Sequence, residues 1–131
     1  MNENQITIVV DAMGGDNSPE KTIRGCEIFL NNNSNVKLII FGDKNTINNN
    51  FIEKNSEMIK FVHCEEVILD EDKPSSILRS KKESSMRKAI EFIKSKNHIG
   101  FVSAGNTGAV TVLSTIILGT LNNIKDRHSV Q

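Results

Sequence analysis

A short segment of small and polar residues has the composition of an anion-binding turn. It spans residues 103–109, reads SAGNTGA, and lies between an apolar run at 99–102 and an apolar helical run at 110–121. Between a strand and a helix, backbone N–H groups converge and the helix dipole adds positive potential. Gly105 and Gly108 would let the backbone approach an oxyanion closely. We therefore predict a site for phosphate or a phosphorylated compound; the alternative is an ordinary turn that binds nothing.

A second glycine-bearing turn lies near the N-terminus. Residues 6–10 are apolar and β-branched, which predicts a buried strand, and the turn at 11–16 (DAMGGD) follows at once. Ser18 and Pro19 then predict a helix start, with Ser18 as the N-cap and Pro19 at the first helical position. In an open α/β sheet ligands bind beyond the carboxyl ends of the strands, so we expect both turns at that edge. The two aspartates of the second turn would hold a hydroxyl, a metal or a basic side chain, or would only shape the turn.

The elements expected around these turns alternate strands with helices. Strands are expected at 5–11, 36–41, 58–63 and 99–103, and helices at 18–31, 44–54, 74–96 (as one helix or a pair) and 110–121. This repetition predicts an α/β fold with a mainly parallel sheet covered by helices on both faces. The last run is apolar on most sides but too short to cross a membrane, which favours a buried helix of a layered fold.

The main cluster of positive charge lies between the two turns in sequence. Its members are Lys73, Arg79, Lys81, Lys82, Arg87 and Lys88. These can be solvated charges on helix surfaces, the usual position of lysine and arginine. They can also present cations to an anionic ligand or an acidic protein, since arginine binds phosphate oxygens bidentately and lysine acts as a point charge. Ser84 and Ser85 could donate to phosphate from the same neighbourhood.

The overall composition argues against some classes of partner. The 16 Lys and Arg balance the 16 Asp and Glu, and Phe is the only aromatic residue, so a nucleic-acid partner is not expected. Cys26 and Cys64 lack metal-ligand spacing, and without a secretory signal we expect reduced thiols in a cytosolic protein. A nucleophile pair of His63 and Cys64 is discounted because neighbours on a strand point to opposite faces. We expect no metal and no cofactor.

Three motifs together resemble one family, the PlsX-type phosphate acyltransferases of bacterial phospholipid synthesis. Residues 11–16 followed by Pro19 resemble its N-terminal signature, and 103–109 resemble its glycine loop. Residues 72–75 (DKPS) and 78–87 (LRSKKESSMR) are similar to its central motif. The motifs stand in the right order and span nearly the whole chain. Residues 1–131 therefore resemble the N-terminal portion of a single phosphate acyltransferase domain.

The resemblance implies a reaction and a setting for it. Inorganic phosphate would attack the thioester of a long-chain acyl group on acyl carrier protein, and the acyl phosphate formed would supply a membrane acyltransferase. The implied fold is a Rossmann-like αβα layer structure related to isopropylmalate dehydrogenases. The implied protein is a homodimer in the cytoplasm, working at the inner face of the membrane. Because phosphate is itself nucleophilic, the enzyme mainly holds two anionic reactants together and stabilises the oxyanion.

The predicted site residues form two groups. The catalytic candidates are Asp11, Asp16, Lys73, Arg79 and Asn106. The phosphate- and substrate-binding candidates are Gly14, Gly15, Lys82, Ser84, Ser85, Arg87, Ser103, Gly105, Asn106, Thr107 and Gly108. Backbone N–H groups of the 103–108 loop would hold phosphate, with side-chain donors from Asn106 and Thr107. The cations would neutralise phosphate or steer the acidic carrier protein, while the two aspartates would order the loops or accept a proton. His63 is a general-base candidate by residue type only, and a structural histidine is the other interpretation.

The resemblance ends near residues 124–127, whereas the family is much longer. The remaining part would supply further strands, much of the acyl-binding cleft, the dimer contacts and the membrane-docking helices. We therefore expect the helix at 110–121 to lack neighbours that cover it. Three hypotheses stay open: a phosphate acyltransferase, either by itself or completed by another polypeptide; a truncated and inactive fragment; or a stand-alone module that binds phosphate or a nucleotide.

Overall fold

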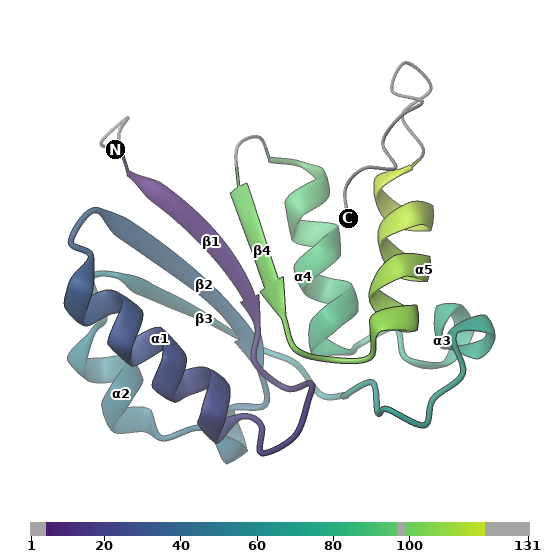
Figure 1. Cartoon of the computed structure of the whole chain (residues 1–131), viewed down its shortest axis with the longest axis horizontal. Helices are drawn as coiled ribbons and strands as arrows, with labels where there is room; N and C mark the ends of the chain where they lie inside the picture. Colours follow the sequence, from purple (N-terminus) through teal and green to yellow (C-terminus); the bar gives the residue numbers. More distant parts are fainter. Residues whose placement is uncertain (1–4, 97–98, 120–131) are drawn as a thin grey trace.

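The computed structural model describes residues 5–96 and 99–119 (Figure 1). The elements in chain order are β1 (Ile6–Asp11), α1 (Glu20–Asn32), β2 (Val36–Gly42), the 3-10 helix η1 (Lys44–Thr46), α2 (Asn49–Lys54), β3 (Ile59–His63), α3 (Pro74–Ser80), α4 (Ser85–Lys94), β4 (Ile99–Ser103) and α5 (Thr107–Leu118). The predicted end of the last helix at 120–121, and the end of the family resemblance at 124–127, lie outside the described residues.

The four strands form one sheet in the order β3-β2-β1-β4, and every pairing is parallel. Val10 at the centre of the sheet pairs with Ile40 of β2 and with Val102 of β4. The order runs outward from β1 to β3 on one side and places β4 on the other. The carboxyl ends of β1 and β4 are therefore a switch point, where open α/β sheets bind ligands.

Helices cover both faces of the sheet, as predicted (Figure 1). Helices α1 and α2 pack on one face, where Cys26 and Leu30 of α1 meet alternate residues of β1 and β2. Helix α4 packs on the opposite face through Ala89, against Val9 and Phe41. A third apolar cluster joins α3, α4 and α5. Its buried members are Ile68, Ile77, Met86, Ile90, Ala109 and Leu113.

Two helix boundaries differ from the prediction. Helix α1 begins at Glu20 with Pro19 as its N-cap residue, so the predicted roles of Ser18 as N-cap and Pro19 as first helical residue are both wrong by one position. The Ser18 hydroxyl is used elsewhere, because it donates to the carbonyl of Gly14. The predicted helix at 44–54 is divided into η1 and α2, since the chain is extended at Ile47. The region at 74–96 is predicted to be either one helix or a pair, and the structure shows a pair, α3 and α4.

Helix α5 begins at Thr107, three residues before the apolar run, because the side chain of Asn106 caps it. Only Ala109 and Leu113 are buried in this helix, so the expectation of a buried helix is wrong. Ile116 is 58% exposed and Leu118 is 40% exposed, which agrees with the expectation that neighbours to cover this helix are lacking. None of the helices in the described part of the chain combines the length and apolar character needed to span a bilayer.

Candidate functional site

The two glycine turns lie against each other beyond β1 and β4, as predicted. A Cβ added at Gly14 would lie 2.3 Å from the Cα of Gly105. Gly15 has a φ of +90°, and a Cβ there would lie 2.7 Å from the carbonyl oxygen of Ala104. The prediction explained glycine by close approach to an oxyanion. At Gly14 and Gly105 the structure shows a different reason, which is close packing of one turn on the other; we call this pair the interlocked turns (residues 11–16 and 103–108).

A buried carboxylate at the end of β1 joins the parts of the site. Asp11 is 1% exposed, and its Oδ1 accepts hydrogen bonds from the Ser85 hydroxyl at 2.5 Å and from the Met13 N–H at 3.1 Å. Its Oδ2 accepts from the Ser103 hydroxyl at 2.9 Å, and Ser103 Oγ accepts from the Gly105 N–H at 3.1 Å. Charge-assisted hydrogen bonds of this kind compensate the burial of a carboxylate. The geometry agrees with the loop-ordering role, one of the two roles predicted for Asp11.

The side chain of Asn106 ties the start of α5 to the segment before α3. Its Oδ1 accepts from the Ala109 N–H at 3.1 Å, and its Nδ2 donates to the carbonyls of Leu69 at 3.1 Å and Asp72 at 3.0 Å. The amide is therefore occupied inside the protein, and the predicted donation from this side chain to phosphate is not what the structure shows. Asparagine is favoured at a helix N-cap because its side-chain oxygen accepts a hydrogen bond from an N–H group of the first helical turn.

The backbone at the start of α5 keeps free donors. Within the described residues, the N–H groups of Thr107 and Gly108 have no hydrogen-bond acceptor. They belong to the first turn of a 12-residue helix, where N–H groups lack intrahelical partners and carry the positive end of the helix dipole. Gly108 packs on α3, since a Cβ there would lie 2.7 Å from Pro74 Cγ. These donors make the start of α5 the best anion site among the predicted residues.

The residues predicted to bind phosphate from α4 have internal partners. Ser84 is fully buried, and its hydroxyl oxygen accepts from the Arg87 N–H at 3.1 Å as the N-cap of α4. Arg87 donates through Nη1 to the Leu78 carbonyl at 2.8 Å and pairs through Nε with Glu91 at 3.0 Å. Ser85 donates to the buried carboxylate described above. The structure therefore shows these three residues supporting the site, and their predicted direct contact with phosphate is not supported by this geometry.

Three predicted cations remain exposed. Lys73, Arg79 and Lys82 have no ion pair and no side-chain hydrogen bond with any residue in the described ranges. Lys73 directly precedes Pro74 and therefore stands beside the start of α5. Arg79 lies in the last turn of α3, and Lys82 follows that helix. The structure therefore places Lys73 next to the start of α5, whereas Arg79 and Lys82 lie at and just after the end of α3.

Asp72 holds in place the segment that follows it, residues 73–82, which we call the cationic segment. This role was not predicted from the sequence. Its Oδ2 accepts from the Leu69 N–H at 2.8 Å and lies 3.1 Å from Lys81 Nζ. The backbone hydrogen bond from Leu69, and then the Lys81 ammonium, lower the pKa of this carboxyl below its ordinary value of 3.8. Lys81 also donates to the carbonyl of Val67 at 2.8 Å. Aspartate two residues before a proline-initiated helix is the only sequence signal for this arrangement.

The remaining candidates lie at the margin of the site or away from it. Asp16 is exposed, and its side chain has no partner within the described residues. His63 ends β3, two strands from β1, where its Nδ1 accepts from the Lys44 N–H at 3.0 Å. This geometry agrees with the structural interpretation of His63. Burial raises the pKa of the Cys64 thiol to about 11, which argues against a nucleophile. No three His, Cys, Asp or Glu side chains gather into a metal site in the part of the chain that the structure describes.

Comparisons with known proteins match the same region. The family described as fatty acid synthesis protein matches residues 6–130, so the expectation that the resemblance ends near residues 124–127 is wrong. The chain is 43% identical over 127 residues to a phosphate acyltransferase of Wolbachia pipientis subsp. Culex pipiens, covering 92% of this chain and 37% of that protein. It is 44% identical over 125 residues to a phosphate acyltransferase of Ehrlichia canis, with the same coverage, and 37% identical over 119 residues to one of Caldicellulosiruptor bescii. The chain thus spans 36% to 37% of the length of these relatives.

Proposed function

The chain belongs to the fatty acid synthesis protein family, and on that premise we propose that it contributes the phosphate site of an acyl-transferring enzyme. The observation that carries the proposal is the pair of N–H groups at Thr107 and Gly108, which have no acceptor within the described residues and lie against Pro74, the residue that follows the exposed Lys73. A helix start with free donors and a nearby cation binds phosphate through general physical chemistry. The name phosphate acyltransferase, carried by the similar proteins, supplies the matching chemistry.

The proposed reaction transfers a long-chain acyl group from acyl carrier protein to inorganic phosphate. A phosphate oxygen attacks the thioester carbonyl, so that a C–O bond forms, the C–S bond breaks and the carrier thiolate leaves. Holding phosphate at the start of α5 fixes the nucleophile and removes much of the entropy cost of the encounter. Asp11 orders the loops in this scheme, because its oxygens already accept three hydrogen bonds. No covalent intermediate with the protein is needed.

The exposed cations suit the proposed partner. Acyl carrier protein is acidic, and Arg79 and Lys82 present charge without internal partners in the described residues. Complementary charge of this kind speeds the encounter and aligns the partners. A homodimer at the inner face of the membrane, and a membrane acyltransferase that receives the acyl phosphate, complete the proposal.

A proline at position 107 tests the phosphate site with little change to the helix. Thr107 is the first helical residue, where proline is favoured, and the backbone of Asn106 at φ −55° and ψ 114° already suits a following proline. Thr107→Pro removes one proposed donor, whereas Thr107→Val removes the hydroxyl and keeps the N–H. We expect Thr107→Pro to weaken inorganic phosphate binding about tenfold in calorimetry, more than Thr107→Val does. Equal affinities in a folded Thr107→Pro protein would contradict the site.

Activity is tested by acyl phosphate formation from long-chain acyl carrier protein and phosphate, together with the oligomeric state. Turnover by the chain would support the full reaction. Turnover only after adding a polypeptide that corresponds to the rest of a relative would support a two-part enzyme. Phosphate binding without turnover in either case would favour a phosphate-binding module, and neither binding nor turnover would favour an inactive fragment.

A further inference from the structure

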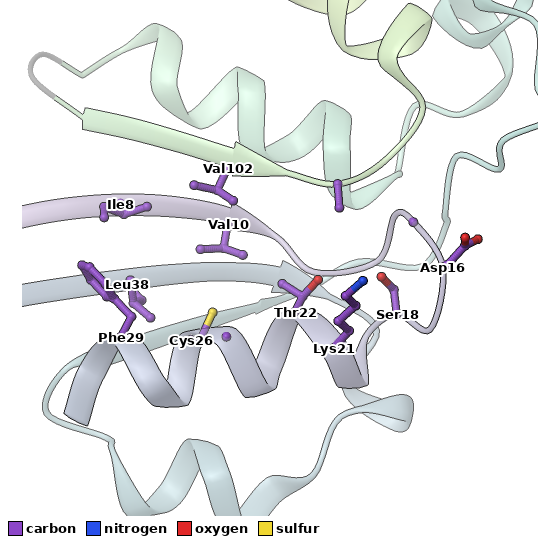
Figure 2. A pocket seen from close by; sticks show the side chains of 13 residues that line it. Ile8, Val10, Asp16, Ser18, Lys21, Thr22, Cys26, Phe29, Leu38 and Val102 are labelled. Carbon is purple, nitrogen blue, oxygen red and sulfur yellow. The ribbon is translucent and has the colours of Figure 1, made fainter. Parts of the chain in front are cut away.

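An apolar groove runs between α1 and the sheet (Figure 2). Its volume is about 620 Å³, within the range typical of sites for small molecules. Side chains from three strands line it, namely Ile8 and Val10 of β1, Leu38 of β2 and Val102 of β4, and Phe29 of α1 faces them. The body of the groove is therefore hydrocarbon from both the sheet and the helix.

The groove is open because α1 covers β1 and β2 and leaves β4 uncovered on this face. Val102 is 53% exposed, although it lies in a parallel strand. Its neighbour Phe101 points to the opposite face and packs in the cluster that includes Ala89 of α4. No helix among residues 5–96 and 99–119 covers Val102. Exposed apolar surface of this kind is a favourable place for an apolar ligand.

One end of the groove meets the interlocked turns. Gly15 and Ala104, one from each turn, both line it. Lys21 of α1 lies at the same end, and its ammonium has no partner within the described residues (Figure 2). Asp16 also lies at this end with the opposite charge, on the exposed loop beyond the helix start. The groove thus has an apolar body and one polar, glycine-bearing end.

We propose that this groove holds the hydrocarbon chain of the acyl group, with the head of the ligand at the interlocked turns. The proposal rests on the proposed function and adds to it the location of the acyl chain. The ligand class is a long-chain acyl phosphate, whose apolar tail matches the body of the groove and whose anionic head lies at the interlocked turns, which include Thr107 and Gly108. Lys21 adds positive charge at that end of the groove. The thioester before transfer would place its chain in the same groove.

Gly25 allows the groove to be filled without crowding the protein. It lines the groove within α1, and a Cβ added there would meet no atom within 4 Å. Gly25→Leu therefore places a branched side chain in the groove at a helix position where glycine is unfavourable. Asn31→Leu is the matched control, since Asn31 is exposed on the same helix and does not line the groove.

The binding experiment compares dodecyl phosphate with inorganic phosphate by calorimetry, at concentrations below micelle formation. Because each buried methylene adds to affinity, we expect dodecyl phosphate to bind the unchanged chain about 100-fold more tightly than inorganic phosphate. Gly25→Leu should reduce dodecyl phosphate affinity by about tenfold or more and leave inorganic phosphate affinity unchanged. Asn31→Leu should change neither.

The outcomes separate this proposal from the proposed function. If inorganic phosphate binds but Gly25→Leu leaves dodecyl phosphate affinity unchanged, the groove assignment is overturned and the phosphate site stands. If inorganic phosphate does not bind while dodecyl phosphate is blocked by Gly25→Leu, the groove stands and the phosphate site fails. Light scattering measures self-association in the same proteins. If Gly25→Leu abolishes self-association but leaves dodecyl phosphate affinity unchanged, the groove binds a second copy of the chain and the acyl-chain assignment is overturned.

The two cysteines give a second readout in the unchanged chain. Cys26 lines the groove, Cys64 packs on the other face of the sheet, and burial raises the pKa of each thiol to about 11. Bound dodecyl phosphate should slow alkylation of Cys26 about fivefold or more and leave Cys64 unaffected, as measured by peptide mass spectrometry. Equal protection of both thiols, or of neither, would contradict binding in the groove.

Discussion

The interlocked turns and the cationic segment at 73–82 both carry motif residues, but they use them in opposite ways. In the turns, the side chains of Asp11 and Ser103 form a hydrogen bond, and Gly14 packs directly on Gly105. Both the polar residues and the glycines of the turns therefore stabilise the fold. In the cationic segment, Lys73 and Arg79 point into solvent without partners in the described residues. One region builds the site and the other is available to a ligand.

The difference shows that residue type alone does not identify a ligand contact. A serine or asparagine in a motif is as suitable for bonding the neighbouring loop as for bonding phosphate. Within the part of the chain that the structure describes, the backbone N–H groups of Thr107 and Gly108 have no acceptor, and the Asn106 side chain holds the start of that helix in place. Substitutions should therefore act on stability in the turns and on binding in the cationic segment.

The largest effect on stability is expected at Gly14. Gly14→Val would place a Cβ 2.3 Å from the Cα of Gly105, and backbone cannot move aside as a flexible side chain can. We expect the free energy of unfolding to fall by about 3 kcal/mol, measured by urea denaturation. Gly25→Ala is the control, because an added Cβ there meets nothing within 4 Å, and it should stabilise the chain by about 0.5 to 1 kcal/mol. Similar effects of the two changes would contradict the packing argument.

A smaller loss is expected when the buried carboxylate loses its charge. Asp11→Asn keeps the volume but replaces one accepting oxygen with an N–H₂ group, which opposes one of the two hydroxyl donors, Ser85 or Ser103. We expect a loss of about 2 kcal/mol in the free energy of unfolding, together with weaker inorganic phosphate binding. Asp16→Asn in the same turn is exposed and should cost less than about 0.5 kcal/mol. If Asp16→Asn were the more damaging, the loop-ordering role of Asp11 would be wrong.

The smallest effect on stability is expected at Asp72, which anchors the cationic segment, and this effect depends on pH. The folded-state pKa of Asp72 lies below the ordinary 3.8, so its stabilising contribution is complete above that ordinary value and is lost as pH falls through the lowered pKa. Because the pair with Lys81 is partly solvated, Asp72→Asn should cost less than about 1 kcal/mol at pH 7. Denaturation midpoints of the two proteins should converge once the pH has fallen below the lowered pKa of Asp72.

Arg79→Ala is the control for the pH dependence of stability measured with Asp72→Asn. It removes an exposed charge without a partner in the described residues, so we expect no change in stability beyond about 0.5 kcal/mol at any pH. Its effect should fall on association with acyl carrier protein, where the dependence of affinity on salt should weaken. A gap between the unchanged chain and Asp72→Asn that does not narrow as the pH falls through the acid range below 3.8 would refute the linkage to this carboxyl.

The sequence allowed the sheet to be predicted well because its signals are local. Residues 6–10 and 99–102 are short apolar runs that end at glycine turns, and both are parallel strands in the structure. The roles of Asn106 and Ser84 could not be predicted in the same way. Asn106 bonds to carbonyls 34 and 37 positions away, and nothing in its own neighbourhood indicates those partners. The groove was likewise hidden, since it depends on which strand lies under which helix.

The Asp11 network also sets when the site can form. Asp11 lies 74 positions from Ser85 and 92 positions from Ser103, so its bond to Ser85 needs α4 in place and its bond to Ser103 needs β4 beside β1. Contacts of such long range are slow to form because the intervening loop must be ordered first. During synthesis the bond from Ser103 therefore cannot form until residue 103 has left the ribosome, so the two glycine turns interlock only after most of the described chain has been made.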